Sequence, residues 1–240
     1  MTRHPPTGPS PVYISAPIAA LVEGIYRADT TIGHVRSKGD FGIGTFNDLD
    51  GEMVLLDGTV YCLRPQGQAE IIEDDVRTPF AIATHFAGDT VDRLEQPIPA
   101  PEFETALIDL IPSSNLFYSI RIDGRFTHVR ARSVPKQGNY LPLAEITKVQ
   151  TVFEFEDVTG TIVGFYTPSF LDSVHVPGFH LHFITADRSQ GGHVLSVAPH
   201  AVTVRLQHSA AVELELPMTL DFLTMQRTRD VHADLAKVER

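Results

Sequence analysis

The sequence predicts an α+β fold that is mostly β. Two observations carry this prediction. The first half consists of short apolar runs separated by strong turn signals, and the second half alternates apolar and polar residues with a period of two. Such alternation is typical of antiparallel strands with one buried face, which close into a barrel or pack as a sandwich. A chain of 240 residues can form one large β domain or two small ones.

The first half begins with one short amphipathic helix between Ile14 and Tyr26, where apolar residues recur at helical spacing. The stretch from Thr31 to Ser37 is compatible with either a helix or a strand. Turn residues at Asn47–Gly51 predict a hairpin between the strands on either side. The strands expected in this half are Phe41–Phe46, Glu52–Leu56, Thr59–Leu63, Ala69–Ile72 and Thr84–Phe86.

The next part of the chain carries one helix and then mainly strands. A polar, proline-rich surface connection is expected over residues 89–101, followed by a helix from Glu102 to Ile111 with its apolar residues in helical phase. Asp123-Gly124 and Thr159-Gly160 are interpreted as turns between strands. The strands expected here are Phe117–Ile122, Phe126–Arg132, Thr161–Tyr166, Val202–Leu206 and Val212–Leu216.

Composition limits the classes of function. The net charge is −11, and 19 basic residues are scattered among 30 acidic ones, so nucleic-acid binding is not expected. No apolar run reaches the roughly 18 residues of a membrane span. The single cysteine, Cys62, fits a reducing compartment, and we expect a cytoplasmic protein. Residues 1–11 are rich in Pro, Thr and Ser, which predicts a disordered leader rather than a signal peptide.

A histidine motif is the strongest chemical signal. His180 and His182 lie two apart in a strand-forming run, so their side chains point to the same face. Residues 187–192 are interpreted as a turn, and His193 begins the next apolar run. In a hairpin with an even number of loop residues, His193 shares that face. Three neutral imidazoles would leave a fourth position open, as catalytic zinc requires, and copper, iron, nickel or manganese are also compatible.

Three polar residues outside the hairpin are candidates for chemistry. Glu52 opens a strand after a tight turn, where burial would make its carboxyl a usable acid or base, although exposed strand-start glutamates are commoner. Arg132, if turned toward a cavity, would bind a substrate carboxylate through two hydrogen bonds, whereas a solvent-facing arginine is the default interpretation. Glu239 would ordinarily be a frayed terminal charge. Histidines not in phase with the hairpin are His175, His200 and His208.

Taken together, several segments resemble the α-acetolactate decarboxylase family, over a stretch from about Tyr13 to Glu239. Ser119 and Asn139 depart from the alanine and proline that are usual in the family. The segments that carry the resemblance are Gly39–Phe46, Leu49–Glu52 with Asp57-Gly58, Arg132–Gln137, Gly160–Phe165, Gly178–Phe183, Asp187-Arg188 and Gly191–His193.

The resemblance implies a site and an architecture. It implies two β-rich domains, namely a mixed N-terminal sheet with short helices and a C-terminal antiparallel, barrel-like sheet, with the metal site facing their interface. With a boundary at Asn115, the expected divisions are residues 12–115, residues 116–229 and a tail of residues 230–240 that reaches the active site as a short helix or extended arm. The residues assigned to the site are His180, His182 and His193 as zinc ligands, Glu52, Arg132 and Glu239 as catalytic residues, and Thr45 with Arg132 as substrate-binding residues.

The implied reaction is the zinc-dependent decarboxylation of (S)-2-acetolactate to (R)-acetoin and carbon dioxide, by a homodimer, on the route to acetoin and 2,3-butanediol. The substrate is a β-keto acid that contains its own electron sink, so no organic cofactor is needed. The enediolate left by loss of carbon dioxide would be stabilised by zinc and Arg132, with a proton from Glu52 or Glu239. Two alternatives remain open: a cupin-like metal-dependent oxygenase or isomerase, and a non-catalytic β-sandwich binding module with a structural metal.

Overall fold

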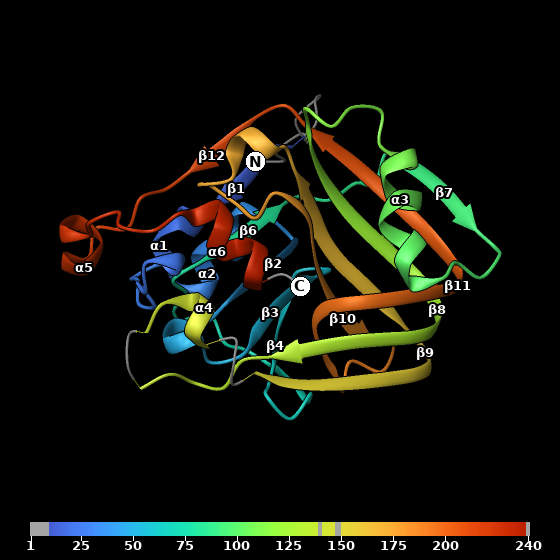
Figure 1. The fold of residues 1–240 in the computed structure, drawn as a ribbon, viewed down its shortest axis with the longest axis horizontal. Coiled ribbons are helices and arrows are strands. Elements are labelled where there is room, and N and C mark those ends of the chain that lie inside the picture. The colour runs from blue at the N-terminus through green and yellow to red at the C-terminus, as the bar shows by residue number, and fades with distance from the viewer. Residues whose placement is uncertain (1–9, 139–140, 147–149, 239–240) are drawn as a thin grey trace, which may run out of the picture.

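A computed structural model describes residues 10–138, 141–146 and 150–238 (Figure 1). Within these ranges the chain forms two β-sheets that pack against each other, with short helices around them. One sheet is mixed, and the other is antiparallel and closes on itself. The expectation of a mostly β fold with a mixed sheet and a barrel-like sheet is therefore confirmed.

The mixed sheet contains seven strands, and its described pairings are antiparallel except that of β1 with β12. Four of its strands form the meander that the turn signals predict, and the strand expected at residues 84–86 lies slightly earlier, as β6. In spatial order the strands are β12 (Val212–Leu214), β1 (Val12–Ile14), β6 (Ala81–Thr84), β2 (Phe41–Thr45), β3 (Glu52–Leu56), β4 (Thr59–Leu63) and β5 (Ala69–Ile71).

The antiparallel sheet contains five strands. Its spatial order is β10 (Gly178–Thr185), β9 (Thr151–Thr167), β8 (Phe117–Ser133), β11 (Gly191–Ser209) and β7 (Thr90–Leu94). Because β10 also pairs with β11, strands β8 to β11 close into a barrel. A surface connection is expected over residues 89–101, but its first part is strand β7, which pairs with β11.

The turns predicted at Asp123-Gly124 and Thr159-Gly160 are absent from the structure, in which β8 and β9 each run unbroken for 17 residues. Gly124 and Gly160 instead face each other across the β8–β9 pair. A Cβ on Gly124 would lie 2.2 Å from the main-chain oxygen of Ala201, and its φ of 151° also favours glycine. These glycines therefore allow a close approach of neighbouring backbones in the barrel wall rather than a reversal of the chain.

The helices are short and lie mainly around the mixed sheet (Figure 1). The helix expected between residues 14 and 26 is reduced to one turn, α1, whereas α3 matches its expected range within two residues. Residues 231–238 of the tail are helical. The helices are α1 (Ile18–Val22), α2 (Ile32–Lys38), α3 (Ala100–Leu110), α4 (Leu143–Ile146), α5 (Leu220–Thr224) and α6 (Val231–Val238), with 3-10 turns η1 (Asn47–Leu49) and η3 (Ser169–Leu171). No helix in the described part of the chain could span a membrane.

Alternate side chains of β10 point into two different core regions. Leu181 and Phe183 point into the barrel, where they join its apolar interior. Ile184 belongs instead to the core between the two sheets, and the side chains of His180 and His182 point to the same side because they are in phase with it. The histidine pair therefore faces the interface between the sheets, as expected. The division of the chain into domains at Asn115 stays a prediction.

Candidate metal and active site

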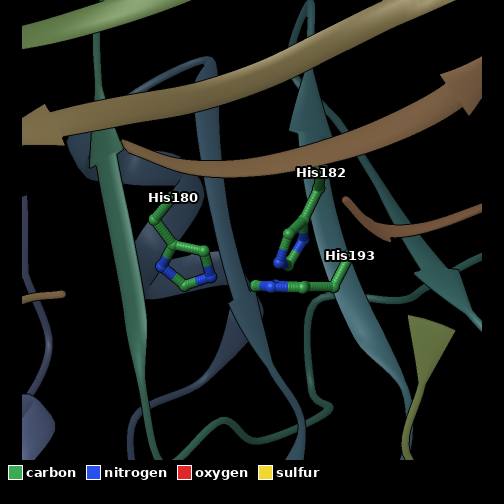
Figure 2. A group of neighbouring side chains, drawn as sticks. All are labelled: His180, His182 and His193. Atoms are coloured by element: carbon green, nitrogen blue, oxygen red, sulfur yellow. The ribbon is translucent and has the colours of Figure 1, made fainter. Parts of the chain in front are cut away.

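The hairpin of β10 and β11 brings three histidines together. His182 pairs directly with His193 across the two strands, and His180 lies two residues earlier on the face of His182. All three are buried, and their candidate ligand nitrogens lie within 4.8 Å of one another. Figure 2 shows the three imidazole rings pointing toward a common centre. His193 therefore lies on the same face of the hairpin as His180 and His182, as the sequence predicts.

The donor set fits a divalent metal ion. His182 Nδ1 lies 2.8 Å from the main-chain oxygen of Met53. Donation to this carbonyl puts the proton on Nδ1 and directs Nε2 toward the other imidazoles, as is usual for metal-binding histidines. Burial, together with the nearby Arg132 cation, holds the pKa of His193 well below its usual value. A ligand histidine must be neutral, so this environment suits a ligand.

Thr45 and Glu52 reach the site from the mixed sheet. They are opposite each other in the β2–β3 pair, in phase with residues of the core between the sheets. The Thr45 hydroxyl donates to the main-chain oxygen of Gly51 at 2.8 Å. Glu52 has only 9% of its surface exposed. A strand-start glutamate that would ordinarily be exposed is thus buried by the barrel.

Arg132 enters from the barrel, where it is the β8 partner of His193. It is 4% exposed. One of its terminal nitrogens, Nη1, lies 3.6 Å from Glu52 Oε1, and Nη2 donates to the main-chain oxygen of Val238 at 3.2 Å. The other Glu52 oxygen lies 3.7 Å from His182 Nε2. Glu52 therefore lies between a buried guanidinium and the histidine cluster.

These groups line a small cavity of about 50 Å³ between the sheets. Its polar wall comes from the strands, and much of its apolar wall comes from helices α1, α4 and α6. The lining residues are Ile18, Leu21, Gly44, Thr45, Leu49, Glu52, Phe80, Arg132, Val134, Leu143, His180, His193 and Val238. The cavity can thus hold a small organic molecule with its polar end on the strands and its alkyl groups against the helices.

Several contacts of the site cannot be predicted from the sequence. The Met53 contact is made by a main-chain carbonyl, and the apolar wall combines α1, α4 and α6, which are far apart in the chain. His175, set aside as out of phase, is buried with its ring 5.3 Å from that of His180, and its Nδ1 is 2.7 Å from the Thr167 hydroxyl. Glu239 lies outside the described residues, although α6 brings Val238 to the cavity.

Comparisons with known proteins agree on one family. A family model described as alpha-acetolactate decarboxylase matches residues 12–228. The alpha-acetolactate decarboxylase of Methanosarcina mazei is 43% identical over 230 residues, which cover 95% of this chain and 80% of that protein. That of Bacillus licheniformis is 42% identical, over 88% of this chain and 84% of its own length. The crystal structure of alpha-acetolactate decarboxylase from Bacillus subtilis superposes with a TM-score of 0.93 at 38% identity, covering 96% of this chain and 99% of that one.

Proposed function

The chain belongs to the alpha-acetolactate decarboxylase family, and we propose that it converts (S)-2-acetolactate to (R)-acetoin and carbon dioxide with the help of a zinc ion. The observation that carries this proposal is the buried group of three histidines, two of which line one small cavity together with Glu52 and Arg132. No observation in the described residues favours the oxygenase or the binding module over it.

His180, His182 and His193 would hold the ion. A zinc ion there would act as a Lewis acid for the negative charge that develops on the substrate oxygens. The remaining wall offers the substrate one carboxylate, one guanidinium and an apolar surface. This combination suits a small anionic keto acid that needs charge stabilisation and one proton.

Arg132 would hold the substrate carboxylate and then stabilise the charge left behind. It is buried, and its Nε has no hydrogen-bond partner among the residues that the structure describes. When the bond to the carboxyl group breaks, carbon dioxide leaves and the electron pair moves into the neighbouring ketone, which gives an enediolate. The guanidinium beside the cavity lowers the energy of this charge because water is excluded there.

Glu52 would deliver the proton that completes the reaction. Its carboxyl lines the cavity beside Arg132 and the histidine group. In its protonated form it would give its proton to the carbon that lost carbon dioxide, and it would then take up a proton from solvent. Because the strand fixes Glu52 on one wall, one face of the enediolate would receive the proton, and a single acetoin enantiomer would form. Thr45 would orient the substrate from the same wall. Glu239 is kept as a second proton donor on the basis of the family resemblance.

We also propose a homodimer in the cytoplasm. The segment around α5 projects from the rest of the molecule (Figure 1) and carries exposed apolar side chains that support the proposed association. These are Leu216, Met218, Leu220 and Leu223. The proposed location relies on the sequence having a single cysteine, Cys62, which is free and buried, as fits a reducing compartment. Sedimentation velocity measurements would test the oligomeric state.

The central experiment is an assay of acetoin formation with bound metal measured in parallel. We expect about one zinc ion per chain, acetoin from racemic 2-acetolactate, and loss of activity with a chelator that zinc restores. Chiral gas chromatography would show the (R) enantiomer. A protein that keeps its metal and forms no acetoin would overturn the proposal.

A further inference from the structure

Leu49 lines the cavity from an unusual backbone conformation. Its φ is 55°, and that of the preceding Asp48 is 65°. Positive φ values are adopted readily by glycine and tolerated by asparagine and aspartate, but they are unfavourable for a bulky apolar residue. A leucine that keeps such a conformation is held in it by its surroundings, and strain of this kind gathers at functional sites.

Contacts on both sides hold this turn in place. The Asp48 amide donates to the main-chain oxygen of Tyr26 at 2.8 Å, and the Gln137 amide donates to the main-chain oxygen of Asp48 at 2.7 Å. The Asn47 side chain accepts from and donates to the backbone of Ala28, both at 3.1 Å. The Asn47 amide also donates to the main-chain oxygen of Arg77 at 3.0 Å. The turn is therefore tied to three separate segments, around residues 26–28, 77 and 137, and these contacts do not involve the leucine side chain.

The held turn presents Leu49 to the site. Leu49 is 3% exposed and lines the same cavity as Glu52, Arg132 and His180. The turn that carries it leads directly into β3, which begins with Glu52. Leu49 and the proposed proton donor therefore approach the cavity from one short segment of chain, three residues apart.

We infer that Leu49 limits the size of the alkyl group that the substrate carries on its reacting carbon. The inference rests on the proposed function, in which that carbon also bears a carboxylate, a hydroxyl and an acyl group. Arg132 and the metal would take up the polar groups, and Glu52 must lie within reach of this carbon to protonate it. The remaining alkyl group then lies near the segment that carries Glu52. A methyl group fits beside Leu49, and a propyl group meets its side chain.

The test compares 2-hydroxy-3-oxo acids that carry methyl, ethyl or propyl at carbon 2, with kcat/KM measured for each on the zinc-loaded enzyme. We expect L49A to raise the propyl-to-methyl ratio of kcat/KM by at least about tenfold, because one methylene group in an apolar pocket changes discrimination about 10- to 200-fold. L49G should raise this ratio as well. Because glycine adopts the positive φ without strain, L49G can replace L49A in the test if L49A folds poorly.

A matched control makes the same leucine-to-alanine change at a buried position outside the cavity. Leu56 is a buried leucine of β3 that does not line the cavity, so L56A should lower stability and leave the ratio unchanged. If the wild type decarboxylates the methyl substrate while L49A and L49G keep its propyl-to-methyl ratio, the inference about Leu49 is overturned and the proposed function stands. A zinc-loaded wild type that decarboxylates none of the three acids overturns the proposed function itself.

Discussion

The Nδ1 atom of His182 in the barrel lies 2.8 Å from the main-chain oxygen of Met53 in the mixed sheet. This hydrogen bond joins a proposed zinc ligand to the strand that also carries Glu52. The orientation of the imidazole therefore depends on how the two sheets pack, and binding of a metal ion would stabilise that packing in return.

Metal binding should raise the thermal stability of the protein. An ion that binds only the folded state at 100 times its Kd adds about 2.7 kcal/mol, which corresponds to roughly 5–10 °C in the Tm of a chain of this size. H193Q should abolish this increase, since it removes one of three ligands, whereas H208Q, at an exposed position outside the cluster, should retain it. Differential scanning calorimetry with zinc or chelator measures the effect. An equal increase in H193Q would argue against the cluster as the metal site.

Without metal, stability should fall as the pH falls below about 6.5. Burial and then Arg132 hold the pKa of His193 well below its usual value. Below the unfolded pKa, the unfolded chain binds a proton that the folded chain does not. The free energy of unfolding therefore decreases toward acid by up to about 1.4 kcal/mol per pH unit for this group, until the folded pKa is reached.

Urea unfolding in chelator at several pH values would measure this dependence. H193Q carries no titratable group at this position, so its slope between pH 6.5 and 5 should be smaller by that amount. Equal slopes in the wild type and H193Q would show that His193 is not held neutral by the fold.

Glu52 should be needed for turnover and not for metal binding. E52Q keeps the size and polarity of the side chain but cannot exchange a proton. We expect zinc content to stay at the wild-type level and kcat to fall by about 10² to 10⁴, the range typical for loss of a general acid or base. E95Q, at an exposed position in the loop after β7, is the matched control and should have wild-type kcat. Unchanged kcat in E52Q would leave the proton transfer to another group.

The grouping of the three histidines can be predicted from the sequence, because residues two apart in a strand point to the same face. His180 and His182 share a face at any register, and an even loop was enough to add His193. The positions of Glu52 and Arg132 relative to these histidines could not be obtained in this way, since they depend on the packing of two sheets. Their assignment came from the family resemblance, and the structure now brings both within 4 Å of each other.

The errors in the predicted strands have a common cause. Asp-Gly and Thr-Gly are strong local turn signals, yet Gly124 and Gly160 lie inside long strands. Nothing in the local sequence distinguishes a glycine needed for chain reversal from one needed because another backbone passes close by. β7 was missed for a similar reason: its polar residues are exposed at the edge of the sheet, so no apolar alternation reveals the strand.

This interpretation of Gly124 predicts a large stability difference between two glycine substitutions. G124A would place a Cβ 2.2 Å from a main-chain oxygen of β11, whereas a Cβ on Gly138 would meet nothing within 4 Å. We expect G124A to lower the free energy of unfolding by about 3 kcal/mol or more, and G138A to change it by less than about 0.5 kcal/mol. Chemical denaturation measures both. Similar stability of the two variants would mean that β8 and β11 can separate at little cost.

Glu23, a carboxylate that does not itself line the cavity, should control how firmly α6 closes it. Glu23, at the end of α1, accepts hydrogen bonds from the amides of Thr228 and Arg229 at 2.7 and 2.9 Å. Arg229 in turn pairs with Asp234 inside α6 at 2.6 Å, and the end of α6 supplies the Val238 carbonyl that holds Arg132. Glu23 thus acts on the site through the segment that leads into α6.

E23Q keeps one acceptor oxygen but loses the charge that strengthens these hydrogen bonds, which are worth about 1.5–3 kcal/mol each when one partner is ionised. We expect faster amide hydrogen exchange in residues 231–238, a several-fold lower kcat/KM and an unchanged zinc content. E102Q, at an exposed position in α3, provides the control. If exchange in α6 rises while kcat/KM does not change, α6 does not position Arg132. If exchange does not rise, Glu23 is not what holds α6 in place.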